Sequence, residues 1–81
     1  MAFSFEISKP RNIEEVENDT REKIEADGGT FDLKSKRFSN GGVEGFYSVG
    51  SNSVTVTITQ KPMFAPESLV KSRITDYFRG K

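Results

Sequence analysis

The sequence predicts an α+β domain, a two-layer sandwich in the order β-α-β-β-β-α, with two helices on one face of a mainly antiparallel four-stranded sheet. Two patterns predict it. Short segments alternate apolar and polar residues, as half-buried strands do, and two longer segments repeat apolar residues at spacings of three and four, as amphipathic helices do. A chain of 81 residues suffices for one core, so residues 1–81 are expected to form a single domain.

The first strand and the first helix follow from local signals. Residues 3–7 alternate apolar and polar side chains, and Pro10 ends this strand. Asn12 is placed to cap the helix that follows, and Asp27-Gly28-Gly29 ends it, because glycine adopts the left-handed conformation after a helix at little cost. The apolar stripe of this helix consists of Ile13, Val16, Thr20 and Ile24.

Three more strands are expected in the middle of the chain. Residues 30–33 form one, and the polar segment 34–42 is predicted as a loop that ends in a turn at Ser39-Asn40-Gly41-Gly42. Residues 43–49 and 52–60 form a hairpin, in which Gly45 marks a bulge or a close helix contact. Valines and Ile58 alternate with threonines in the second of these strands, so one sheet face should be apolar and the other β-branched but wettable.

The last element is a helix that begins at Pro66 and ends at Gly80. Proline suits the first helical position, since its missing N–H is no loss there. The buried stripe consists of Val70, Ile74, Tyr77 and Phe78, with Leu69 at its margin.

Two missing residue types exclude much chemistry. The chain has no cysteine and no histidine, which removes disulfides, thiolate nucleophiles, the commonest metal ligands and every Ser-His or Cys-His arrangement. The acids, lysines, serines and tyrosines show no spacing that brings them together, so no enzymatic activity and no cofactor are expected. Without a signal sequence or a long apolar segment, a cytoplasmic protein with no transmembrane span is predicted.

Charge is unevenly distributed, although acids and bases balance at 12 each. Residues 14–27 are strongly acidic, and the last third of the chain is basic, which favours self-association through opposed charges. Lys34, Lys36 and Arg37 form a candidate basic surface that could bind nucleic-acid phosphate beside Phe38. Nucleic acid is nevertheless not the expected partner, because the net charge is zero and Phe38 has an alternative role in the core.

Met63 and Phe64 are candidate contacts for a partner or ligand. They lie between Pro62 and Pro66, which stiffen the segment, so these side chains either anchor the loop under the last helix or stand exposed for a partner or an acyl chain. Anchoring is the favoured interpretation, because an apolar residue before a helix often packs on its first turn. Tyr47 and Tyr77 could supply hydroxyl groups to a pocket, although half-buried tyrosines are common at element edges.

The run from residue 41 to residue 78 resembles the small bacterial polyhydroxyalkanoic acid system proteins. The resemblance lies in the Gly42-Val43-Glu44-Gly45 motif, the valine-rich strand after it and the closing helix with spaced aliphatic residues. The chain departs from the family in lacking a histidine in its opening segment and in its Lys-Pro-Met-Phe-Ala-Pro connection. The resemblance implies a non-catalytic accessory protein associated with storage granules, and it transfers no catalytic residue.

Two functional hypotheses follow. The first is a non-enzymatic interaction or assembly module that binds a protein partner, a granule or itself. The second is a carrier or sensor of a small apolar, acyl-type ligand between sheet and helices, lined by aromatic residues. The proposed lining consists of Phe3, Phe5, Phe31, Tyr47 and Phe78.

Overall fold

The computed structural model describes residues 3–79, and this range forms one sheet and two helices. The strands are β1 (Phe3–Ser8), β2 (Thr30–Asp32), β3 (Arg37–Asn40), β4 (Val43–Val49) and β5 (Ser53–Gln60). The helices are α1 (Ile13–Ala26) and α2 (Glu67–Arg79). All strand pairs are antiparallel, and the order across the sheet is β1-β5-β4-β3-β2. The first strand of the chain, β1, therefore lies at one edge of the sheet and pairs with the last strand, β5.

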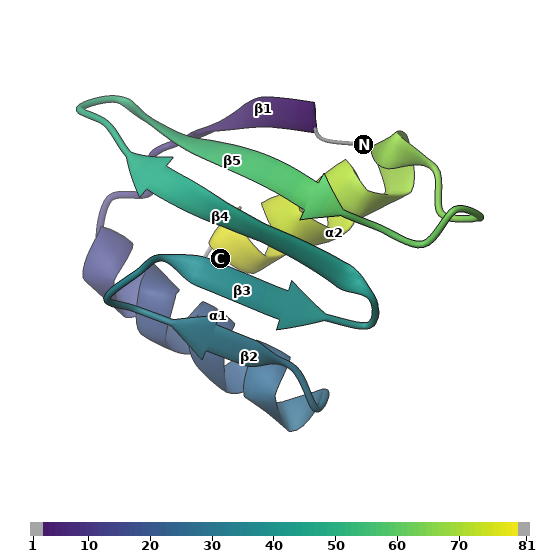
Figure 1. Ribbon diagram of the computed structural model, residues 1–81. Helices are drawn as coiled ribbons and strands as arrows, with labels where there is room; N and C mark the ends of the chain where they lie inside the picture. Colours follow the sequence, from purple (N-terminus) through teal and green to yellow (C-terminus); the bar gives the residue numbers. More distant parts are fainter. Residues whose placement is uncertain (1–2, 80–81) are drawn as a thin grey trace.

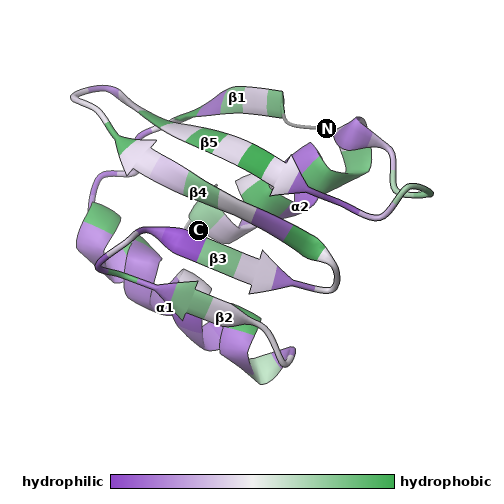
Figure 2. Cartoon of the chain, in the orientation of Figure 1, coloured by the Kyte–Doolittle hydropathy of each residue, from purple (hydrophilic) through white to green (hydrophobic). Residues whose placement is uncertain are grey.

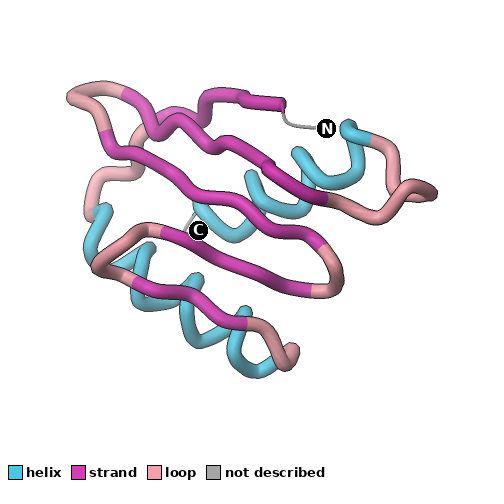
Figure 3. Tube along the Cα trace, viewed as in Figure 1, coloured by secondary structure: helices cyan, strands magenta, loops and turns pink. Residues whose placement is uncertain are grey.

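The two helices lie on the same face of this sheet (Figure 1). α2 packs against β1, α1 packs against β2, and the helices contact each other between them. Figure 3 shows the same two layers, with the helical coils behind the strands. The α+β class with two helices and an antiparallel sheet is therefore confirmed.

The predicted number of strands is wrong, because the segment 34–42 contains β3. Phe38 is the reason, since its side chain is only 4% exposed and packs beside Phe31 of β2. β3 pairs with β2 on one side and β4 on the other, which gives the order β-α-β-β-β-β-α. The expected turn at Gly41-Gly42 is present and short, because both glycines have positive φ, 60° and 86°, as a two-residue hairpin turn requires.

Gly45 lies where β3, β4 and β5 meet, and a larger residue does not fit there. A Cβ atom at this position would overlap the backbone oxygen of Thr57 and lie 3.2 Å from Cα of Ile58. The register between β4 and β5 shifts between Glu44 and Gly45, so the expected bulge is present. Because Gly45 has no side chain, the Phe38 ring can pack over β4 on the helix side of the sheet. The ring would lie only 3.2 Å from a Cβ atom at position 45.

The strand alternation separates two sheet faces as predicted. Val54, Val56 and Ile58 of β5 are fully buried under the helices, whereas the threonines between them are partly exposed. Alternating apolar and paler bands are visible along β5 in Figure 2, and α1 is mostly hydrophilic on its outer side. The sheet face away from the helices is thus polar and β-branched.

Both helices bury most of the expected stripes, but Ile13 and Tyr77 are only partly buried. Val16, Thr20 and Ile24 of α1 are buried, and so are Val70, Ile74 and Phe78 of α2, with Leu69 half exposed at the margin. The Thr20 hydroxyl donates a hydrogen bond of 3.0 Å to the backbone oxygen of Tyr77, which joins the two helices. Pro66 precedes α2 instead of opening it, and its oxygen accepts from the amides of Leu69 and Val70. The predicted end at Gly80 lies outside the described residues.

Candidate functional site

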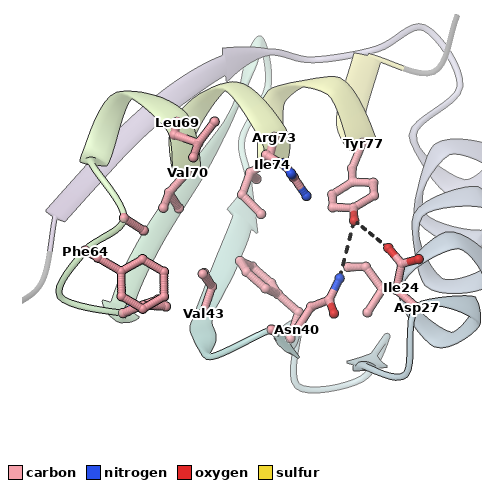
Figure 4. A pocket seen from close by; sticks show the side chains of 14 residues that line it. Ile24, Asp27, Asn40, Val43, Phe64, Leu69, Val70, Arg73, Ile74 and Tyr77 are labelled. Atoms are coloured by element: carbon pink, nitrogen blue, oxygen red, sulfur yellow. Dashed lines mark hydrogen bonds between the residues drawn. The ribbon is translucent and has the colours of Figure 1, made fainter.

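A groove of about 510 Å³ opens between α2 and the turn that joins β3 to β4 (Figure 4). Its lining comes from the end of α1, the β3–β4 hairpin, the loop before α2, and α2 itself. The lining residues are Ile24, Asp27, Phe38, Asn40, Gly41, Val43, Pro62, Phe64, Ala65, Leu69, Val70, Arg73, Ile74 and Tyr77. Most of these side chains are apolar, and Figure 4 shows the polar ones gathered at the end away from Phe64.

The polar end of the groove is organised by the Tyr77 hydroxyl. It donates a hydrogen bond to Oδ2 of Asp27 and accepts one from Nδ2 of Asn40, both at 3.3 Å. Burial raises the pKa of Tyr77, and the neighbouring Asp27 carboxylate raises it further, whereas Arg73 acts in the opposite direction. Tyr77 therefore stays neutral at physiological pH and ties α2 to both α1 and β3.

Met63 and Phe64 project from the loop before α2, so the prediction that they anchor this loop is wrong. Met63 is 98% exposed and Phe64 is 89% exposed, although Phe64 also borders the groove. Polar contacts hold the loop instead, because Nζ of Lys61 donates to the oxygen of Ala65 at 2.7 Å and the amide of Ala65 donates to the oxygen of Pro62 at 3.1 Å. Met63 and most of Phe64 are therefore not covered by the rest of the described chain.

Tyr47 has a different environment from Tyr77, because it is almost completely buried under α1. Its hydroxyl donates a short hydrogen bond to Oε2 of Glu17, and Nζ of Lys36 lies 3.1 Å from the same oxygen. Burial raises the pKa of Tyr47 well above the ordinary tyrosine range, and the adjoining Glu17 carboxylate adds to this effect. We call Glu17, Lys36 and Tyr47 the buried triad after its two buried members, since the Lys36 side chain is 37% exposed.

The buried triad brings together a carboxylate, an amine and a hydroxyl, yet its geometry is structural. Lys36 and Tyr47 both bind the Glu17 carboxylate, and none of the three lines the groove beside α2 or the pocket beside β2. A catalytic base or nucleophile needs access to a bound substrate. The triad joins α1 to β4 and to the turn before β3.

Lys34, Lys36 and Arg37 are not gathered on one surface. Lys36 turns toward Glu17, and its positive φ of 60° belongs to the tight turn between β2 and β3. Arg37 points to the other sheet face, where it lies 6.0 Å from the ring centre of Phe46. Lys34 lies in the turn, where the Asp32 carboxylate accepts hydrogen bonds from the amides of Lys34 and Ser35, which lowers the pKa of Asp32.

The five aromatic residues proposed to line an apolar ligand site instead pack together. Phe31, Tyr47 and Phe78 lie with ring centres 5.1 to 6.5 Å apart, and Phe3 stacks on Phe5 at 6.1 Å. None of the five lines the groove. The predicted lining by these five rings is therefore not what the structure shows, although Phe31 borders a second, more open pocket of about 450 Å³ beside β2.

Sequence reasoning missed four features of the groove: Asp27, Asn40, Arg73 and the β3–β4 turn as a wall. Asp27 and Asn40 were interpreted only as helix-end and turn residues. Their hydrogen bonds to Tyr77 join positions 50 and 37 residues apart. No periodic signal in a single sequence reports such contacts.

The sequence matches no protein-family model, and no similar curated protein or solved structure was found. Neither helix within residues 3–79 is long and apolar enough to cross a membrane. Over the same residues, no group of three or more acidic side chains is close enough to hold a metal ion.

Proposed function

We propose that this protein is a non-enzymatic accessory module that attaches to the apolar surface of a polyhydroxyalkanoate granule by inserting Met63 and Phe64. The observation that carries the proposal is the nearly complete exposure of both side chains on one stiff loop. Two adjacent large apolar side chains form a contiguous exposed patch, and such patches mark contact sites. The resemblance of the chain to granule-associated proteins supports a granule as the target, although the loop itself is where the chain departs from that family.

The size of the exposed tip favours a soft apolar phase over a protein partner. A specific protein partner covers about 800 Å² on each side, whereas a large aromatic side chain contributes about 150–250 Å². Two side chains on a narrow loop fall well short of a protein interface. Insertion into an apolar phase requires only that the two side chains enter it, and it needs no large matching surface. Each side chain that is fully buried there contributes about 1.5–3 kcal/mol of binding free energy.

The loop is built to keep the two side chains extended. Pro62 and Pro66 restrict the backbone on either side, and Lys61 bonds the loop carbonyls at its base. A preformed tip loses little conformational entropy when it inserts. The same bonds keep the backbone polar groups of the loop base paired.

Sedimentation with protein-free polyhydroxyalkanoate particles tests the proposal. The wild type is expected to pellet with the particles, and the double variant M63S/F64S is expected to bind at least tenfold more weakly. The matched control is Phe46→Ser, which removes a partly exposed aromatic side chain from the opposite sheet face. Failure of the wild type to pellet, or equal losses in the double variant and the control, would overturn the proposal.

A further inference from the structure

The groove beside α2 has an apolar length and a polar end, which is the layout of a site for an amphiphile (Figure 4). We infer that it binds one medium-chain carboxylate, with the carboxylate at Arg73 and the alkyl chain lying toward Leu69 and Phe64. This site shares Phe64 with the tip that inserts into the granule, but its charged contact is Arg73 and its lining does not include Met63.

The apolar length fits an alkyl chain. Buried Ile24, Phe38, Val70 and Ile74 form a floor without polar side chains, and half-exposed Leu69 forms a wall. The volume of about 510 Å³ lies within the range of about 300–1,000 Å³ for small-molecule sites.

The length of the groove suggests the length of the chain. Arg73 and Leu69 are four residues apart on α2, which is about 6 Å along the helix axis. The groove continues beyond Leu69 to Ala65 and Phe64, so a chain of medium length can lie in it from Arg73 onward.

Arg73 supplies the charge that selects a carboxylate. Its side chain points from α2 toward the polar end of the groove in Figure 4. Arg73 is exposed, and its charge acts on the Tyr77 hydroxyl at the polar end of the groove, where it works to lower the pKa of that group. A guanidinium on the rim of an apolar groove complements a carboxylate, to which it can donate two parallel hydrogen bonds.

Asp27 is the opposing charge at this end, and its position favours an anion at Arg73 instead of a cation at Asp27. The Asp27 carboxylate already accepts a hydrogen bond from the Tyr77 hydroxyl. Figure 4 shows it on the far side of Tyr77 from Arg73, toward the end of α1. A ligand carboxylate beside Arg73 is thus separated from Asp27 by the tyrosine.

An NMR titration of the isotope-labelled chain with decanoate below its micelle concentration tests the inference. The largest amide shifts are expected at Gly41, Val43 and along α2 from Leu69 to Tyr77. Decanol and decylammonium serve as neutral and cationic comparisons. Decanoate is expected to bind at least fivefold more tightly than either, because only it can pair with Arg73.

Two variants of the same helix separate a specific charge contact from general attraction. Arg73→Gln is expected to weaken decanoate binding at least fivefold and to leave decanol binding unchanged. The matched control Lys71→Gln removes an equal charge from a residue that does not line the groove, so both ligands should bind as before. Leu69→Glu should weaken the binding of both ligands, because it places a charge beside the alkyl chain.

Three results would overturn the inference: wild-type decanoate affinity in Arg73→Gln, an equal loss in Lys71→Gln, or tighter binding of decylammonium than of decanoate. The R73Q variant should still pellet with polyhydroxyalkanoate particles. Loss of the groove ligand would therefore leave granule attachment standing. The reverse separation uses Met63→Ser alone, because Phe64 also lines the groove: this variant should attach more weakly to the particles and bind decanoate as the wild type does.

Discussion

Phe31 and Phe64 have the same side chain but lie in two regions of the molecule that differ in how much they bury it. Phe31 on β2 is 5% exposed and packs among Phe38, Tyr47 and Phe78, beside the buried triad. Phe64 on the loop before α2 is 89% exposed. The first region packs its apolar groups and pairs the Glu17, Lys36 and Tyr47 side chains internally, whereas the second exposes its apolar side chains. The comparison separates side chains that stabilise the fold from those that we propose bind an apolar surface.

The largest expected effect comes from making the same change in both regions. Phe31→Ala should lower the free energy of unfolding by about 3–5 kcal/mol, because it leaves a cavity among packed rings. Phe64→Ala should change it by no more than about 0.5 kcal/mol, as exposed positions do. Urea denaturation of both variants measures the contrast. A large loss in Phe64→Ala would mean that the loop is packed in solution.

Tyr47→Phe tests the hydrogen bonds of the buried triad, beside Phe31. Removing its hydroxyl takes one hydrogen bond from the Glu17 carboxylate, which is nearly buried, and should cost about 1–3 kcal/mol of unfolding free energy. The measurement is urea denaturation at neutral pH. A change below about 0.5 kcal/mol would show that Lys36 and water satisfy Glu17 equally well.

Alkaline pH should lower the free energy of unfolding, because Tyr47 loses its proton. Burial and Glu17 raise the pKa of Tyr47 above the ordinary value of 10.0, so the unfolded chain loses this proton at lower pH than the folded chain. The stabilisation is complete below about pH 10 and declines as the pH rises further. Unfolding free energy followed from pH 8 to 11 should decline less steeply in Tyr47→Phe. Equal slopes in both proteins would contradict the assignment, since Tyr47→Phe removes the titrating hydroxyl.

Tyr77→Phe gives the smallest expected effect and reports on the groove end. Its two hydrogen bonds, at 3.3 Å each, are longer than the usual optimum and partly exposed. The loss of unfolding free energy should therefore be about 0.5–1 kcal/mol. A loss as large as that of Tyr47→Phe would show that the hydrogen bonds at the polar end of the groove are as well shielded from water as those of the buried triad.

Much of the fold follows from local patterns, and its main error has a physical cause. The helix stripes, the Gly41-Gly42 turn and the Gly45 bulge each have a local sequence signal. β3 does not, because its four residues carry one apolar side chain, Phe38, and its stability comes from pairing with strands on both sides. A short central strand of this kind depends on tertiary context more than on propensity.

The candidate site was less predictable, since each of its features depends on distant contacts. The apolar pair before α2 has the same sequence pattern whether it packs on the helix or stands exposed, so the prediction of anchoring was wrong. Glu17 lies in an acidic helix with no signal that it alone is buried beside Tyr47. Tyr77 was singled out from sequence, but its partners Asp27 and Asn40 were not.

The central claim, that Met63 and Phe64 insert into an apolar surface, is tested most directly by a fluorophore at the tip. The chain contains no cysteine, so Met63→Cys provides a single labelling site, and Ser51→Cys in the β4–β5 turn provides the control. On addition of polyhydroxyalkanoate particles, an environment-sensitive dye at position 63 should shift to shorter wavelength while one at position 51 stays unchanged. Equal spectra at the two positions, with particles present, would contradict insertion through this loop.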